Sequence, residues 1–340
     1  MSTAKQWLVV TIDTEEEGLW SGQYSRETTV ENIQAVPRFQ ALCDQFSIRP
    51  TYLITTPVAE SSQATSVLRS ILDAGKCEIG THVHPWNSPP FEEQNSKEVS
   101  YLCNLPLNIQ FAKIENLTSQ IEQSFGVRPI SFRAGRYGAD AETISCLRKL
   151  GYLVDSSVLP GADYRSGNGP DFRKANCLPY YPNDGDILAC GEDDSLLEIP
   201  VSAGFTHRYF EAAERMRKLA MRSPWRSMRA VGILDRLGIA SQTKLSPEQA
   251  SIGKMRRLAT SILARSNPVL VLMFHSSSLL PRCSPYVNSE ADLNRFLDRL
   301  EQFFEYATDR VGLTPITLGE CYQHREKITA PMAPSAISDG

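Results

Sequence analysis

The chain has 340 residues and a formal net charge of −4 at pH 7, with 41% hydrophobic and 22% charged residues. This composition is typical of a globular protein and excludes disordered and fibrous chains, and the acidic balance argues against a nucleic-acid binder. The longest uninterrupted apolar run, Val269–Phe274, is far shorter than the ~20 residues that cross a bilayer. The apolar stretch Trp7–Ile12 is too short for a signal peptide. We therefore expect a cytoplasmic protein.

Apolar and β-branched runs alternate along the chain with segments of helical periodicity. Strands are predicted at Trp7–Asp13, Thr51–Thr55, Glu78–Thr81, Pro129–Arg133, Leu153–Ser156, Val269–Phe274 and Leu313–Thr317. Helices are predicted at Glu31–Phe46, Ser61–Ala74, Asn108–Phe125, Ala141–Leu150 and Asp292–Ala307. Repeated alternation of this kind predicts an α/β fold with a parallel sheet, either closed as a barrel or doubly wound.

Three segments interrupt this alternation. Residues 160–194 are rich in Gly, Pro, Asn and Asp and predict a long loop. Residues 205–265 carry 13 Lys/Arg and 4 Asp/Glu, a net charge of +9, and predict a basic helical insertion. We favour a helical flap whose arginines pair with acids of the first third of the chain, and the alternative is peripheral contact with an anionic membrane surface. Residues 327–340 lack periodicity and predict a disordered tail, which leaves 1–326 as a single domain.

Polar side chains follow most of the predicted strands. In barrels and open α/β sheets, reactive groups gather at the carboxyl ends of strands. Three of the five histidines of the chain lie at such ends. The candidate site residues are Asp13, Glu15, His82, His84, Trp86, Arg133, Arg136, Tyr137, Asp155 and His275.

The spacing of the acids and histidines favours a metal site. Asp13 and Glu15 are two residues apart, as are His82 and His84. In extended backbone, residues two apart point to the same side, so each pair can enter one site. Two imidazoles and a carboxylate with an open position can hold a divalent ion, by default Zn²⁺, with Co²⁺, Ni²⁺ or Fe²⁺ as alternatives. A second carboxylate nearby can then act as general base.

Each residue also has a purely structural interpretation. Glu15–Glu17 is an acid run, which is commonly just solvated. Asp155 could cap a helix, and His275 could donate to a backbone carbonyl. Only their joint placement at strand ends favours a functional site. A serine hydrolase and a nucleotide site are disfavoured, because no G-x-S-x-G elbow and no phosphate-binding loop follows a strand.

Five segments resemble, in the same order, the five motifs of the polysaccharide deacetylase family of metal-dependent carbohydrate esterases. They are Thr11–Glu15, Glu78–His84, Phe132–Gly138, Val154–Val158 and Leu270–Ser276. The resemblance implies a distorted (β/α)7-type barrel, with the helical insertion placed before the last barrel strands. It also implies that residues 1–326 form a catalytic domain that removes N-acetyl groups from an amino sugar of a glycan or glycan precursor.

The resemblance implies roles for four of the candidate residues. Asp13 would be the general base, and Arg133 would hold it. His275 would be the general acid that protonates the leaving amine. Asp155 would orient His275 and tune its charge.

The ligand set implied by the resemblance needs two replacements. The family commonly has adjacent acids in the first motif, but Thr14 takes the second position here, so Glu15 is the expected ligand. The paired histidines of the family are commonly four residues apart, but Trp86 takes that position here. His84, the nearest imidazole, is therefore expected to join His82 as a metal ligand. The substrate pocket is expected to be lined by Trp86, Arg136 and Tyr137.

Two other functions remain open at this point. One is a related C–N hydrolase that acts on small linear or cyclic amides, because the same barrel can host either reaction. The other is a non-catalytic carbohydrate-binding relative on the same scaffold.

Overall fold

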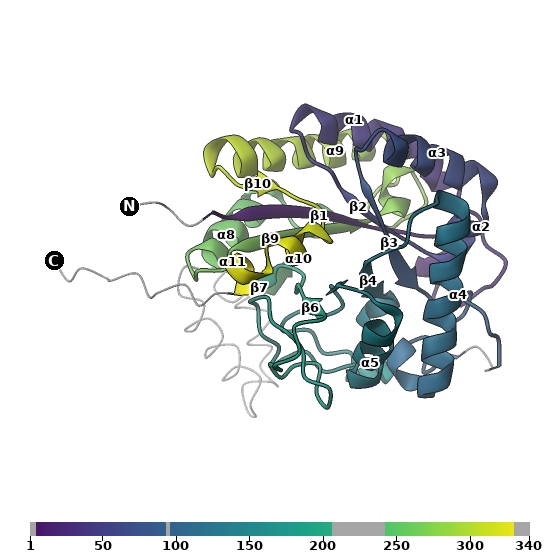
Figure 1. The fold of residues 1–340 in the computed structure, drawn as a ribbon. Helices are drawn as coiled ribbons and strands as arrows, with labels where there is room; N and C mark the ends of the chain where they lie inside the picture. The colour runs from purple at the N-terminus through teal and green to yellow at the C-terminus, as the bar shows by residue number, and fades with distance from the viewer. Residues whose placement is uncertain (1–4, 93–95, 206–241, 330–340) are drawn as a thin grey trace, which may run out of the picture.

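A parallel sheet organises the part of the chain that the computed structural model describes, residues 5–92, 96–205 and 242–329 (Figure 1). Every strand pair of this sheet is parallel. Its strands are β1 (Trp7–Thr14), β2 (Thr51–Ile54), β3 (Glu78–Val83), β4 (Ser131–Ala134), β5 (Val154–Asp155), β6 (Leu197–Glu198), β9 (Val269–His275) and β10 (Thr314–Pro315).

The strands follow the order β9-β1-β2-β3-β4-β5-β6, with β10 paired to the start of β1. Beyond β6, the amide of Ser202 donates to the carbonyl of Val271 on β9 at 3.3 Å. This contact joins the segment after β6, the last strand of the series, to β9, the first one. The sheet therefore closes into an irregular barrel. The distorted (β/α)7-type barrel predicted from the sequence is therefore confirmed.

Helices pack around the outside of the sheet, with α1, α3 and α9 together on one side of it (Figure 1). The helices are α1 (Val36–Gln45), α2 (Thr56–Glu60), α3 (Ser62–Asp73), α4 (Leu107–Phe125), α5 (Ala141–Leu150), α8 (Ile252–Leu263), α9 (Glu290–Glu305), α10 (Glu320–Gln323) and α11 (Arg325–Thr329). Ser61 caps the start of α3, since its hydroxyl accepts from the amide of Ala64.

Side chains of β1 alternate between two buried clusters. Leu8, Val10 and Ile12 belong to the large cluster between sheet and helices, whereas Trp7 and Val9 belong to a smaller one formed with residues of β5, β6 and β9. Residues of one strand that are two apart point to the same side. Asp13 therefore points to the same side as Trp7 and Val9, at the carboxyl end of the barrel.

The predicted basic insertion is only partly described. An antiparallel pair, β7 (Ala203–Phe205) with β8 (Gln242–Lys244), flanks residues 206–241, which lie outside the described residues. Helix α8 agrees with the helical prediction, but the strand β8 corrects it at 242–244. The proposed flap and the membrane contact fall mostly on residues that are not described.

Other expectations from the sequence are met or adjusted in detail. Between residues 160 and 194 the structure has isolated bridges and one short 3₁₀ turn, as expected for a loop. Residues 327–329 belong to α11, so the predicted tail begins too early, and residues 330–340 lie outside the described part.

All eight cysteines are free. Within the residues described, no helix is long and apolar enough to span a membrane.

Replacing Gly80 of β3 with Ala is expected to destabilise the barrel. A Cβ at Gly80 would lie 2.6 Å from Leu53 Cδ2 and 2.9 Å from the carbonyl oxygen of Ser131. We expect a loss of about 1–3 kcal/mol in the free energy of unfolding, measured by denaturant titration. The control is Gly253→Ala in α8, where the nearest atom is 3.8 Å away. Equal stabilities of the two variants would contradict the prediction.

Candidate metal centre

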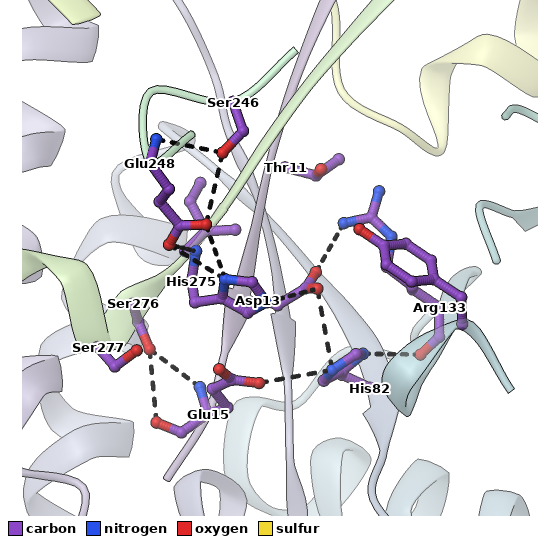
Figure 2. A network of polar contacts seen from close by, with 12 residues as sticks. Thr11, Asp13, Glu15, His82, Arg133, Ser246, Glu248, His275, Ser276 and Ser277 are labelled. Atoms are coloured by element: carbon purple, nitrogen blue, oxygen red, sulfur yellow. Dashed lines mark hydrogen bonds and ion pairs between the residues drawn. The ribbon is translucent and has the colours of Figure 1, made fainter. Parts of the chain in front are cut away.

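The carboxyl ends of β1, β3, β4 and β9 bring the predicted acids and histidines together (Figure 2). Asp13 is in register with His275 on β9, and His82 is in register with Arg133 on β4. Figure 2 shows Asp13 at the centre of the group, with His275 on one side and His82 on the other. Six of the sequence candidates thus meet at one place: Asp13, Glu15, His82, His84, Arg133 and His275.

Three of these side chains form a group that could hold a divalent metal ion. Oε2 of Glu15 lies 3.7 Å from Nε2 of His82 and 3.5 Å from Nε2 of His84. One ligand atom from each residue lies within 4.8 Å of the others. Oε1 of Glu15 is buried and has no hydrogen-bond partner. Such an atom is costly unless something satisfies it, and a cation would do so.

Both imidazoles are oriented as metal ligands. Nδ1 of His82 is 2.8 Å from the carbonyl oxygen of Arg133, and Nδ1 of His84 is 2.7 Å from Oε1 of Glu16. A carbonyl oxygen only accepts, so Nδ1 of His82 carries the proton and its Nε2 keeps a lone pair. Burial is the main reason that the pKa of His82 falls to about 3, so the ring is neutral near pH 7.

The three glutamates that follow β1 each have a separate partner, so the acid run is not a solvated stretch. Glu15 faces the two histidines. Glu16 is buried and accepts from Nδ1 of His84 and from Nδ2 of Asn87 at 2.6 Å. Glu17 accepts from the backbone amide of Asn32 at 2.6 Å. The role of Glu16 was missed because its partner lies 68 residues away and nothing in the local sequence indicates it.

Asp13 is held as an ionised carboxylate. Its Oδ1 accepts from Nη1 of Arg133 at 2.6 Å, while its Oδ2 lies 4.0 Å from Nε2 of His82 and 3.9 Å from Nε2 of His275. Burial alone would raise the pKa of Asp13, but the Arg133 charge and the two histidines outweigh it and lower the pKa below its usual range. Arg133 is fixed in turn by donating to the carbonyl and hydroxyl oxygens of Ser156, both at 2.9 Å.

His275 is oriented by Glu248, a residue that the sequence analysis did not identify. Its Nδ1 lies 3.1 and 3.0 Å from the two carboxylate oxygens of Glu248, which also accepts from the Ser278 hydroxyl at 2.7 Å. Burial raises the pKa of Glu248, but the charge and the hydrogen bond of His275 outweigh burial and lower it. The acid therefore stays ionised and can stabilise a protonated imidazole.

The expected contact between Asp155 and His275 is corrected by the structure. Asp155 accepts instead from the hydroxyl of Ser157 and lies in register with Glu198 of β6. The reason is the alternation along β5, because Val154 belongs to the inner cluster and its neighbour Asp155 points away from it. Burial raises the pKa of Asp155 above its usual range.

A cavity of about 330 Å³ lies over the group and includes Trp86, Arg136 and Tyr137, the residues expected at the substrate pocket. Trp86 stacks on His84, with ring centroids 4.3 Å apart. Trp20, which the sequence analysis did not single out, packs edge-on against His275 at 5.1 Å and also lines the cavity. Aromatic side chains therefore form the sides of the cavity, and the ionised carboxylate of Asp13 lies at its base.

Comparisons with known proteins give similar folds. No family model and no curated protein matches the chain. A candidate glycoside hydrolase/deacetylase from Parabacteroides distasonis has a TM-score of 0.62 at 12% identity, over 95% of this chain and 72% of that one. A 4-alpha-glucanotransferase from Thermococcus litoralis has a TM-score of 0.52 at 16% identity, over 94% of this chain and 40% of that one. A candidate polysaccharide deacetylase from Mycobacterium smegmatis has a TM-score of 0.48 at 18% identity, over 94% and 95%.

The fold of this chain is thus shared with that of the candidate glycoside hydrolase/deacetylase, as the sequence motifs lead one to expect. The glucanotransferase shares enough of the barrel to be similar as well, so the fold by itself does not decide the reaction. The chemistry has to be argued from the side chains at the strand ends.

The contact between Glu16 and His84 is expected to support metal binding. Replacing Glu16 with Gln removes the carboxylate that fixes the His84 ring, and such changes typically lower metal affinity about 10–100-fold. Titration of the apoprotein with Zn²⁺ measures the effect. Glu17→Gln is the matched control from the same acid run, because Glu17 bonds to Asn32 and Thr29 instead. Equal zinc affinities of the two variants would show that Glu16 has no such role.

Proposed function

We propose that this chain is a divalent-metal-dependent hydrolase that removes the N-acetyl group from an amino sugar of a glycan or glycan precursor. One observation carries the proposal. Nε2 of His82, His84 and His275 each lies within 4.0 Å of a carboxylate of Asp13 or Glu15, and each ring is held at Nδ1 by an oxygen. This arrangement supplies a metal site, a base and an acid within one cavity.

The metal would be held by Glu15, His82 and His84, and Zn²⁺ is the first ion to test, with Co²⁺, Ni²⁺ and Fe²⁺ as alternatives. When bound, such an ion polarises the acyl carbonyl and so makes its carbon more electrophilic. The buried, unpartnered Oε1 of Glu15 supports a cation at this place.

The protein side chains would carry the proton transfers. Asp13, kept ionised by Arg133, takes a proton from the attacking water as the new C–O bond forms. His275 in its protonated form gives a proton to the amide nitrogen as the C–N bond breaks, which releases acetate and a free amine. Glu248 stabilises the positive charge of His275 before that transfer.

The cavity walls support a sugar as the substrate. Trp20, Tyr24, Trp86 and Tyr137 all line the cavity above the catalytic group. Sites for organic ligands are typically lined by aromatic side chains with a few polar groups that fix orientation. The carbohydrate is thus the partner that the chemistry of the site favours.

A substrate panel tests the proposal. The purified protein is analysed for bound metal and then assayed for acetate release from N-acetylhexosamine mono- and oligosaccharides, with linear amides and cyclic imides as competitors. We expect acetate release from the sugars, loss of activity with a chelator, and recovery when Zn²⁺ is added. Turnover of imides without acetate release would favour the small-amide hydrolase, and a protein that neither binds metal nor turns over would be a non-catalytic relative.

His275→Ala is expected to lower kcat by ~10²–10⁴-fold, the usual contribution of a general acid. The metal content should stay unchanged, because the proposed ligands are Glu15, His82 and His84. Steady-state kinetics and elemental analysis of the same preparation measure both quantities. Loss of metal in this variant would assign His275 to the ligand set.

Mutations of Glu248 and Asp155 are expected to have very different effects on kcat. Glu248→Gln removes the negative charge beside His275 and should lower kcat by ~10²-fold or more. Asp155→Asn should stay close to the wild type in kcat, because Asp155 contacts Ser157 on the other side of β5. Circular dichroism of both variants checks folding. The opposite ranking would restore Asp155 to the role expected from the sequence.

A further inference from the structure

Arg136 lines the cavity and is surrounded by neutral groups. Its Nη1 donates to the hydroxyls of Tyr24, at 2.9 Å, and Ser100, and its Nη2 donates to the hydroxyl of Tyr101 at 2.8 Å. The guanidinium carbon also lies 3.9 Å from the centroid of the Tyr101 ring. Within the described residues, no carboxylate lies within ion-pair distance of Arg136. The buried Arg133, by contrast, is paired with Asp13.

The guanidinium keeps hydrogen-bonding capacity for a ligand. Arginine has five N–H donors, and the three hydroxyls use three of them. One donor on Nε and one on Nη2 of Arg136 therefore have no partner among the residues that the structure describes. Donors on Nε and Nη2 are those that can bind the two oxygens of one anion side by side.

The backbone places Arg136 here against its own conformational preference. Arg136 and Tyr137 have φ values of 56° and 59°, so two successive residues that are not glycine are left-handed. Gly135 before them is packed so closely that an added Cβ would lie 2.5 Å from Cδ2 of His84. Strained backbone of this kind is found mostly at functional sites, where the surrounding structure holds it in place.

A second cation adjoins the same cavity wall. Nζ of Lys244, on β8, donates to the hydroxyl of Tyr137 at 3.3 Å. The part of the chain that is described places no carboxylate within ion-pair distance of Lys244. The acids whose charges act on it are mainly Glu248 and Asp13, and these are already bonded to His275 and Arg133.

We propose that the substrate is an anionic amino sugar, and that Arg136 binds its carboxylate or phosphate group while Lys244 adds to the attraction. The inference rests on the proposed function and narrows its substrate class. Hydrogen bonds between charged partners are about twice as strong as neutral ones, and with a neutral sugar neither of the two partly buried cations would have an anion at ion-pair distance among the described residues. The two cations therefore favour a negatively charged substrate over a neutral one.

The test compares kcat/KM for acetate release from three N-acetylated sugars: a neutral hexosamine, the same sugar with a carboxylate substituent, and the same sugar with a phosphate. We expect at least a tenfold preference for one anionic form, and the better of the two identifies the group. Arg136→Gln should lower that preference by about 10–100-fold, the value of a hydrogen bond between charged groups. Lys244→Gln should lower it to a smaller extent and serves if the first variant does not fold.

Arg325→Gln is the matched control, because Arg325, in helix α11, also stacks on a tyrosine, Tyr322 of α10, and does not line the cavity. It should leave the preference unchanged. Equal kcat/KM values for all three sugars would overturn the inference and leave the deacetylase proposal standing.

If no sugar releases acetate, the deacetylase proposal fails, and binding then decides the inference by itself. Calorimetric titration of the same three sugars should show tighter binding of an anionic form that is lost in Arg136→Gln. Equal binding of neutral and anionic sugars would overturn it.

Discussion

The centre depends on the hydrogen bonds that Nδ1 of three imidazoles makes with oxygen acceptors. The acceptors are the carbonyl of Arg133 for His82, Glu16 for His84 and Glu248 for His275. Because each ring is fixed at Nδ1, each Nε2 faces a carboxylate of Asp13 or Glu15. Those acids are crowded: burial, Asp13 and Glu16 raise the pKa of Glu15 well above its usual range. A cation between Glu15 and the Nε2 atoms of His82 and His84 would relieve this repulsion, so the tautomers of the two rings and the charge of the acids both favour a bound cation.

The barrel makes this geometry possible by collecting distant residues at one edge. Asp13 and His275 are 262 positions apart in the chain and directly in register in the sheet. Because all strands of this sheet run parallel, the ends that carry polar side chains lie on the same side. The side chains are fixed by strand alternation and by buried partners, which is a firmer support than a loop would give.

The same alternation explains what the sequence could and could not predict. Asp13 and His82 follow from it, because a run of β-branched and apolar residues defines which side each strand end faces. The alternation along β5 also excludes Asp155, but a two-residue strand gives too little pattern to reveal this beforehand. Glu248 could not be predicted, since it belongs to no strand and reaches His275 only through the packing of the segment after β8. The antiparallel pair of β7 and β8 was missed for a similar reason, as its pairing is a tertiary contact.

Aromatic side chains line the cavity, and within the described residues Arg136 and Lys244 have no carboxylate at ion-pair distance. These features support the proposed anionic sugar as the substrate. The central claim about this site is that one divalent ion joins Glu15, which follows β1, to His82 and His84, at the end of β3. X-ray data collected on zinc-loaded crystals at the zinc absorption edge test this most directly. The account predicts one anomalous peak at about 2.0–2.2 Å from Nε2 of His82, Nε2 of His84 and a carboxylate oxygen of Glu15. A peak elsewhere, or none at this place at full zinc loading, would contradict it.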